Sequence, residues 1–233
     1  MNFNKFDLPI VDVIPEIQSK LSTNNTLILN APPGAGKSTL LPLALYQENW
    51  LKGQKIIMLE PRRLAAKTIA NRLSELLGET VGNTVGYRIR FDTKVSESTK
   101  IEIVTEGILT RMLQSDNALE NVGMVIFDEY HERSIHADLA LALCRETQSI
   151  LREELRILIM SATLNMPELV ELLNAPTVVS EGRQYPVETF YEDLSDEYMM
   201  AETTAQVIVK ALKTRKGDVL AFLPGQREIA KCA

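Results

Sequence analysis

Short apolar runs alternate with longer amphipathic stretches along most of this 233-residue chain. The runs cover residues 26–29, 55–59, 100–104, 122–127, 155–160 and 218–223. Because these runs are almost entirely apolar, each predicts a strand that is buried on both faces of a parallel sheet. The stretches at 62–77, 107–114 and 136–154 carry apolar residues near helical spacing and predict helices that flank the sheet. The pattern therefore predicts an α/β fold.

The pattern changes at residues 174–187, which are rich in turn-forming residues and contain Pro176 and Pro186. We interpret this segment as a linker, with a first domain at 1–178 and the start of a second at 179–233. A strand at 187–191, a helix at 197–213 and the strand at 218–223 are expected in the second part. About 50 residues cannot bury a core alone, so this second domain is expected to be cut short.

Composition and charge restrict the class of protein and the kinds of site that the chain can contain. Hydrophobic residues make up 45% of the chain and charged residues 24%, as in ordinary globular proteins. With a net charge of −6, a nucleic-acid partner would have to be held locally by a few arginines and backbone amides. Two cysteines, Cys144 and Cys232, argue against a disulfide framework or zinc site and favour a reducing, cytoplasmic setting. No signal peptide, membrane span or membrane partner is expected.

The segment "APPGAGKS" at 31–38 lies between the first apolar run and a helical stretch. Glycines at 34 and 36 let successive backbone N–H groups converge on phosphate oxygens. Lys37 can reach the β- and γ-phosphates, and the Ser38 hydroxyl can bind Mg²⁺. A glycine-rich turn without a ligand is the alternative, but the strand–loop–helix context favours a nucleotide site. Its predicted residues are Ala31, Pro32, Pro33, Gly34, Ala35, Gly36, Lys37, Ser38 and Thr39.

A second candidate segment, "VIFDEYHERS" at 125–134, ends an apolar run with Asp128 and Glu129. Asp128 is placed to hold Mg²⁺, and Glu129 to orient and deprotonate an attacking water, with Lys37 as the third predicted catalytic residue. Alone, such a pair would often be a solvated acidic turn; the glycine-rich loop upstream favours the catalytic interpretation. His131 lies close enough in sequence to share this role, whereas His136 is expected to be structural.

These segments carry a resemblance to a known family. "DEYHERS" resembles the DEAH-box signature of superfamily 2 helicases, with Tyr130 where alanine is usual. In the family's order, "EPRRLAAKTIANRL" (60–73) resembles motif Ia, "TEGILTRML" (105–113) motif Ib, and "SAT" (161–163) motif III. "GDVLAFLPGQREI" (217–229) resembles motif IV of a second RecA-like domain. The ordered set covers almost the whole chain and is most similar to the bacterial HrpB-type branch of DEAH-like RNA helicases.

The resemblance implies a RecA-like P-loop NTPase domain that uses ATP and Mg²⁺ and binds single-stranded nucleic acid, in particular RNA. Arg62 and Arg63 match the arginines of motif Ia, which approach the nucleic-acid backbone; solvated helix-start arginines are the alternative. Thr105 and Gly107 match the nucleic-acid contact of motif Ib, with a helix N-cap threonine as the alternative.

Four more roles follow from the resemblance. Arg72 lies where the family stacks an arginine on the purine, although a surface helix arginine would look the same. His131, Ser161 and Thr163 match positions that couple the state of the nucleotide to domain movement.

The family's motifs V and VI, with their arginine fingers and a glutamine that meets the DEAH histidine, are not found before Ala233. An arginine finger contributes about 10³–10⁵ in rate. We therefore expect an N-terminal fragment that hydrolyses ATP poorly and acts with the rest of the second RecA-like domain and C-terminal domains in cis. The alternatives are a DNA-directed helicase or translocase, a nucleotide-binding regulatory module without catalysis and, more remotely, a small-molecule kinase.

Overall fold

The apolar runs of the first 161 residues lie side by side in one sheet. They form β1 (Thr26–Asn30), β2 (Lys55–Leu59), β5 (Ile101–Val104), β6 (Val122–Phe127) and β7 (Arg156–Ser161). The computed structural model describes residues 3–163, 167–182, 186–192 and 199–233. The chain divides into two units, Met1–Gln184 and Tyr185–Ala233, and each is described by itself.

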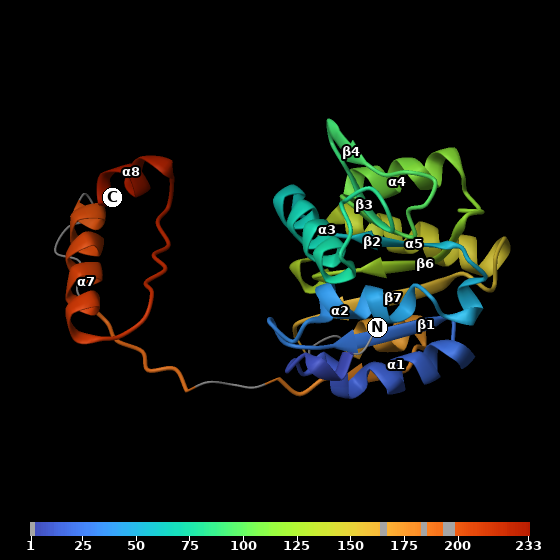
Figure 1. Ribbon diagram of the computed structural model, residues 1–233, viewed down its shortest axis with the longest axis horizontal. Helices are drawn as coiled ribbons and strands as arrows, with labels where there is room; N and C mark the ends of the chain where they lie inside the picture. Colours follow the sequence, from blue (N-terminus) through green and yellow to red (C-terminus); the bar gives the residue numbers. More distant parts are fainter. Residues whose placement is uncertain (1–2, 164–166, 183–185, 193–198) are drawn as a thin grey trace. The chain divides into compact units, whose positions relative to one another are not determined.

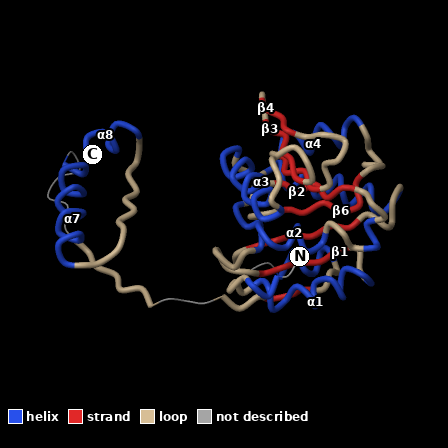
Figure 2. Tube along the Cα trace, in the orientation of Figure 1, coloured by secondary structure: helices blue, strands red, loops and turns tan. Residues whose placement is uncertain are grey.

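Three short strands complete the sheet and were not predicted. They are β3 (Val85–Ile89), β4 (Asp92–Lys94) and β8 (Thr177–Val179), the last within the predicted linker. The strand order is β4-β3-β5-β2-β6-β7-β1-β8, and every neighbouring pair is parallel except β3 and β4. Figure 1 shows the labelled strands in this order from β4 to β1, and Figure 2 shows the strands in red among the helices. The mostly parallel sheet confirms the predicted α/β fold.

Helices cover both faces of the sheet. On one face lie α1 (Ile10–Thr23), α2 (Lys37–Leu45) and α3 (Arg63–Leu77), and on the other α4 (Glu106–Ser115), α5 (Ile135–Ile150) and α6 (Pro167–Leu173). Alternate residues of a strand point to opposite faces of the sheet. Leu27 and Leu29 pack against the helices α1 to α3, and Ile28 packs against the helices α4 to α6. Short 3₁₀ turns are η1 (Phe3–Lys5), η2 (Asn49–Leu51) and η3 (Tyr130–Glu132). Among the described residues, no helix is long and apolar enough to cross a bilayer.

Strand register brings the segments that follow β1, β2, β6 and β7 to one edge of the sheet. Asn30 lies opposite Ser161 in the β1–β7 pair, and Leu59 lies opposite Phe127 in the β2–β6 pair. The segments that follow these four strands therefore emerge together, at the carboxyl edge where ligands bind in parallel α/β sheets.

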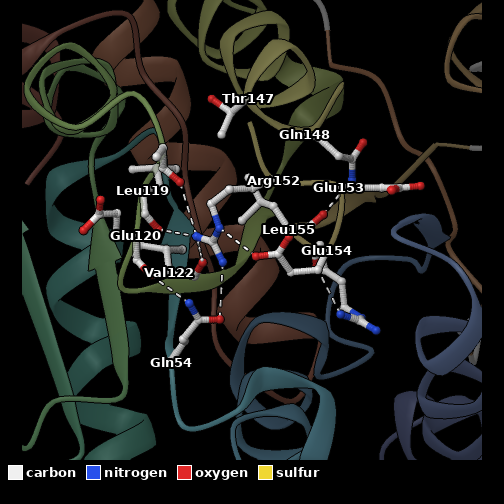
Figure 3. A network of polar contacts seen from close by, with 12 residues as sticks. Gln54, Leu119, Glu120, Val122, Thr147, Gln148, Arg152, Glu153, Glu154 and Leu155 are labelled. Atoms are coloured by element: carbon white, nitrogen blue, oxygen red, sulfur yellow. Dashed lines mark hydrogen bonds and ion pairs between the residues drawn. The ribbon is translucent and has the colours of Figure 1, made fainter. Parts of the chain in front are cut away.

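The opposite edge is held by the guanidinium of Arg152, which follows α5 (Figure 3). Its Nη1 donates to the carbonyl oxygens of Leu119 (2.5 Å), Val122 (2.8 Å) and Ala118 (3.2 Å). Its Nε donates to Glu154 at 2.9 Å. One buried cation thus satisfies two carbonyls of the loop that leads into β6 and the carbonyl of its first residue.

The second unit contains α7 (Met200–Thr214), close to the helix predicted at 197–213, and α8 (Gln226–Cys232). Two predicted strands are wrong for this chain, because 187–191 and 218–223 have no regular secondary structure. A strand needs a neighbour for its N–H and C=O groups, and the described residues of this unit provide none. Residues 183–185 of the predicted linker and 197–198 of the predicted helix lie outside the described residues.

Candidate nucleotide site and nucleic-acid interface

The glycine-rich loop joins β1 to α2. Gly34 and Gly36 have φ angles of +77° and +90°, which L side chains rarely adopt. At Gly36 space is also limiting, since a Cβ would lie 2.9 Å from Leu8 Cδ1. The loop is fixed at both ends: the Ala31 N–H donates to the Ser161 carbonyl (3.0 Å), and the Ala35 carbonyl accepts from Ile10 N–H (3.0 Å). The backbone N–H groups of this loop and the start of α2 are the groups that the predicted phosphate cradle would use.

Lys37 begins a chain of polar contacts across the sheet edge. Its Nζ lies 2.8 Å from Glu129 Oε1, and Glu129 Oε2 lies 3.3 Å from His131 Nε2. His131 Nδ1 accepts the backbone N–H of Ala162 at 3.2 Å. Because Nδ1 accepts, a neutral imidazole carries its proton on Nε2, which faces the Glu129 carboxylate. The contacts join the three predicted segments at 31–38, 128–131 and 161–163.

Asp128 is buried beside this chain. The pKa of its carboxyl is raised to about 6, mainly by burial and also by the charge of Glu129, while the nearby Ser38 hydroxyl lowers the pKa. Oδ1 accepts the Glu129 N–H at 2.9 Å, while the buried Oδ2 has no hydrogen-bond partner among the described residues. An orphaned carboxylate oxygen next to a serine hydroxyl fits Mg²⁺, which is commonly held by one or two protein ligands together with phosphates and waters.

Glu60, which the sequence analysis did not single out, is a third carboxylate at this edge and, like Asp128, is buried. It follows β2, and its Oε1 accepts the Arg62 N–H at 3.1 Å. The pKa of Glu60 is raised to about 7, mainly by burial and also by the charges of Asp128 and Glu129, while the hydrogen bond from the Arg62 N–H lowers the pKa. Glu60 therefore fixes the turn into α3 and adds to the negative charge beside the phosphate cradle.

The segments that resemble motifs Ia and Ib line a surface cavity of about 670 Å³. Arg63, Thr105 and Gly107 lie on its wall together with Arg90 and Arg111, which the sequence analysis missed. Thr105 occupies the N-cap position of α4, yet its side chain makes no capping hydrogen bond. The structure therefore does not show the alternative role of Thr105, in which its hydroxyl caps the helix.

The tip of the β3–β4 hairpin also lines this cavity. Phe91 is 89% exposed with φ of +68°, and the Arg90 guanidinium lies 4.7 Å from its ring centroid. The signal for both residues was present in "VGYRIRFD" (85–92), but an exposed aromatic at a two-residue turn could not be distinguished from a connecting loop.

Arg62 and Arg72 make contacts that sequence reasoning did not anticipate. The Arg62 guanidinium pairs with the Glu132 carboxylate of η3. The Arg72 guanidinium pairs with Glu75 on the same helix at 3.4 Å. The structure does not bring Arg72 to the glycine-rich loop, and its contact with a purine stays a prediction. Ser161 Oγ lies 3.2 Å from the Thr163 N–H and 3.4 Å from its hydroxyl, which holds the "SAT" turn together.

Comparison with known proteins shows the family. The DEAD/DEAH box helicase family model matches residues 12–172, more than half of the chain. The chain belongs to the DEAD/DEAH box helicase family. It is 49% identical over 225 residues to ATP-dependent RNA helicase HrpB of Escherichia coli (strain K12), and 33% identical over 228 residues to the Homo sapiens ATP-dependent RNA helicase DHX33. These alignments cover 96% and 95% of this chain.

The crystal structure of the Escherichia coli DEAH/RHA helicase HrpB superimposes with a TM-score of 0.91 at 48% identity, over 97% of this chain. The match confirms the family and the RecA-like α/β fold that the sequence predicted. The chain spans 28% of HrpB and 32% of DHX33 by sequence, and 29% of the HrpB chain in the crystal structure. It therefore corresponds to less than a third of these relatives.

Proposed function

We propose that this chain is the ATP-binding part of an ATP-dependent RNA helicase, with residues 1–178 as the first RecA-like domain and 179–233 as a linker and the start of a second. The contact chain from Lys37 through Glu129 and His131 to Ala162 carries the proposal. It connects the phosphate cradle, a general-base candidate and the segment resembling motif III. The relatives named as RNA helicases support RNA over DNA as the partner.

In the proposed mechanism Lys37 has two partners in turn. Without nucleotide its ammonium neutralises the Glu129 carboxylate, and with nucleotide it turns to the β- and γ-phosphates. The exchange leaves Glu129 beside His131, able to accept a proton from water. Mg²⁺ would neutralise phosphate charge, held by the Ser38 hydroxyl and the Asp128 carboxylate. His131, bonded to the Ala162 backbone, would relay the change to Ser161 and Thr163.

The proposed nucleic-acid interface is the cavity lined by Arg63, Thr105 and Gly107, together with Arg62, which directly precedes Arg63 in the chain. Guanidinium, hydroxyl and backbone groups suit phosphate oxygens and read no base, so the grip would be largely independent of sequence. Exposed Phe91 adds a ring on which a base can stack. A reducing, cytoplasmic location is part of the proposal, supported by two unpaired cysteines, Cys144 and Cys232.

The substitution Glu129→Gln in the helicase that contains this chain tests the proposal. It keeps the size of the side chain but removes the base. ATP hydrolysis in the presence of poly(U) should fall by about 10²–10⁴-fold, while binding of a fluorescent ADP should persist. Glu16→Gln, an exposed carboxylate paired with Lys20 in α1, is the matched control. Normal turnover by the Glu129→Gln variant would remove Glu129 from the catalytic role.

The polymer that activates ATP hydrolysis more strongly distinguishes an RNA partner from a DNA partner. Poly(U) and oligo(dT) of equal length should be compared side by side as activators of ATP hydrolysis. Stronger activation by RNA is the expected result; equal or stronger activation by DNA would favour the DNA-directed alternative. Absence of hydrolysis with either polymer would favour a nucleotide-binding regulatory module.

A further inference from the structure

Glu132, the last residue of η3, contacts both predicted sites and has no role in the mechanism above. Its backbone N–H donates to the Glu129 carbonyl at 2.9 Å, so it belongs to the turn that carries the candidate base. Its carboxylate pairs with the guanidinium of Arg62, a predicted phosphate contact. A single residue therefore joins the backbone of the catalytic segment to the nucleic-acid surface.

The turn between Glu129 and Arg133 is conformationally unusual at both ends. Glu129 has φ +50° and ψ +34°, and Arg133 has φ +48° and ψ +117°. Residues with a side chain rarely adopt positive φ, and such conformations persist where surrounding contacts hold them. The contacts here include the Glu132–Arg62 pair. Loss of a holding contact should therefore change the turn more readily than it would change a regular helix.

Other residues in and next to the turn are anchored more firmly than Glu132. The Tyr130 hydroxyl donates to Asp138 at 2.6 Å, and the Tyr130 ring packs edge-on against Phe127. The Ser134 hydroxyl donates to Glu106 in the first turn of α4 at 2.5 Å. Glu132 instead borders a cavity of about 200 Å³ that also reaches Asp128 and Glu129. Its side chain therefore has space in which to move.

The Glu132–Arg62 pair is also easily exchanged. The two side chains are 35% and 70% exposed, and ion pairs in water-accessible positions contribute little to stability. A backbone phosphate carries the same charge as the carboxylate and binds a guanidinium equally well. Arg62 can thus be held by Glu132 or by nucleic acid, but the two acceptors compete for the same donors.

We propose that Glu132 is a positioning residue that senses nucleic acid, because its ion pair with Arg62 is a latch that holds the Glu129 turn until a backbone phosphate displaces the carboxylate. The proposal rests on the proposed helicase function. Release of Glu132 lets the turn rearrange around Glu129 and His131, so occupancy of the surface alters the catalytic segment. By reciprocity, the free energy that holds the latch closed weakens the grip on nucleic acid by the same factor.

Binding of fluorescent poly(U) RNA to the helicase that contains this chain is the first test. Glu132→Gln should tighten binding by about two- to fivefold, the range expected for an exposed ion pair. In an Arg62→Gln background the same change should have no effect. Glu132→Asp, which keeps the charge but shortens the reach, should act in the same direction and serves if the Glu132→Gln variant does not fold. Equal effects of Glu132→Gln with and without Arg62 would overturn the proposal.

ATP hydrolysis is the second test. Glu132→Gln should raise the rate without RNA by about two- to fivefold and leave the rate at saturating RNA unchanged, which lowers the stimulation ratio. A merely structural role would lower both rates together and would refute the latch. The matched control is Glu16→Gln, which breaks another exposed ion pair remote from both sites. If the unmodified protein is not stimulated by RNA, the proposed function itself fails; if it is stimulated and Glu132→Gln behaves like Glu16→Gln, only the latch fails.

Discussion

Three carboxylates, Glu60, Asp128 and Glu129, meet at the edge of β2 and β6, where the phosphates of a nucleotide would also lie. Burial raises the pKa values of Glu60 and Asp128, and the neighbouring negative charges raise both further. Such crowding stores unfavourable electrostatic energy in the protein without ligand, which a bound cation would relieve. These carboxylates, which include the predicted Mg²⁺ ligand Asp128, therefore lower the stability of the folded protein when no cation is bound.

Glu60→Gln tests this crowding through the pH dependence of stability. The raised pKa means that the folded state binds the Glu60 proton more tightly, so wild-type stability falls as pH rises from about 4.5 to about 7. The glutamine side chain keeps the oxygen that accepts the Arg62 N–H but has no charge to lose. Without Mg²⁺ the variant should gain up to about 3 kcal/mol over wild type between pH 5 and pH 8, since a tenfold change in proton affinity is worth about 1.4 kcal/mol.

Urea unfolding at the two pH values measures that difference. Glu75→Gln, the same change at an exposed carboxylate, is the control and should follow the wild-type pH profile. An equal effect of Glu60→Gln at pH 5 and pH 8 would mean that the carboxyl titrates alike in the folded and unfolded chains.

Residue types and spacing were enough to predict the cradle, Asp128, Glu129 and His131 as one site, and the structure brings these segments together. The ion pairs between these side chains could not be predicted from residue types and spacing. The contacts of Lys37 with Glu129 and of Arg62 with Glu132 join segments 92 and 70 positions apart, and each depends on register across the sheet. Glu60 was overlooked because one carboxylate in a predicted helix start carries no pattern; its burial becomes visible only when β2, β5 and β6 are assembled.

At the scale of elements, the mainly apolar strands from β5 to β1 in the sheet order were predictable, and those at the sheet margins were not. β4 and β8 have three residues each, and β3 contains the polar Arg88, so none gives a continuous apolar run. Arg88 is nevertheless accommodated in the sheet, because its guanidinium pairs with buried Glu102 of β5. Such a pair is invisible in either strand alone. Helix α1 was also missed, although Ile10, Ile14, Ile17 and Leu21 recur at helical spacing.

The carbonyl cluster around Arg152 should matter for stability and not for catalysis, because it lies at the edge opposite the nucleotide site. Arg152→Met retains much of the side-chain volume but leaves the Ala118, Leu119 and Val122 carbonyls without their donor. A buried polar group without a partner costs about 1–3 kcal/mol. With partial relaxation, a total loss of about 3–5 kcal/mol is expected from the urea midpoint at constant slope.

Arg72→Met is the matched control, because its exposed pair with Glu75 should contribute no more than about 0.5 kcal/mol. Fluorescent ADP binding by the Arg152→Met variant, measured well below its unfolding temperature, should equal that of wild type. A loss of affinity under those conditions would contradict the separation of the two edges.

At the scale of the whole molecule, the two units differ in how far sequence pattern determines structure. In the first, eight strands provide one another with partners, and the predicted strands form. In the second, the run at 218–223 has the same apolar character but stays irregular, with Leu220 and Phe222 79% and 87% exposed. Helices satisfy their own backbone, so α7 and α8 form without a sheet. The pattern specifies a tendency, and the neighbours decide whether a strand exists.

Hydrogen exchange can test whether residues 218–223 are a strand waiting for partners. In a protein that continues past residue 233 with further strands of a second RecA-like domain, these amides should exchange about 10³-fold more slowly than in the 233-residue chain, because opening a central strand costs a large part of the global stability. The amides of α7, which bond within the helix, give the internal control and should change far less. If Val219–Phe222 are protected as strongly in the monomeric 233-residue chain as in the longer protein, the strand forms unaided. Equal and weak protection in both proteins would show instead that this run is not part of a second sheet, and the proposed domain boundary would have to be redrawn.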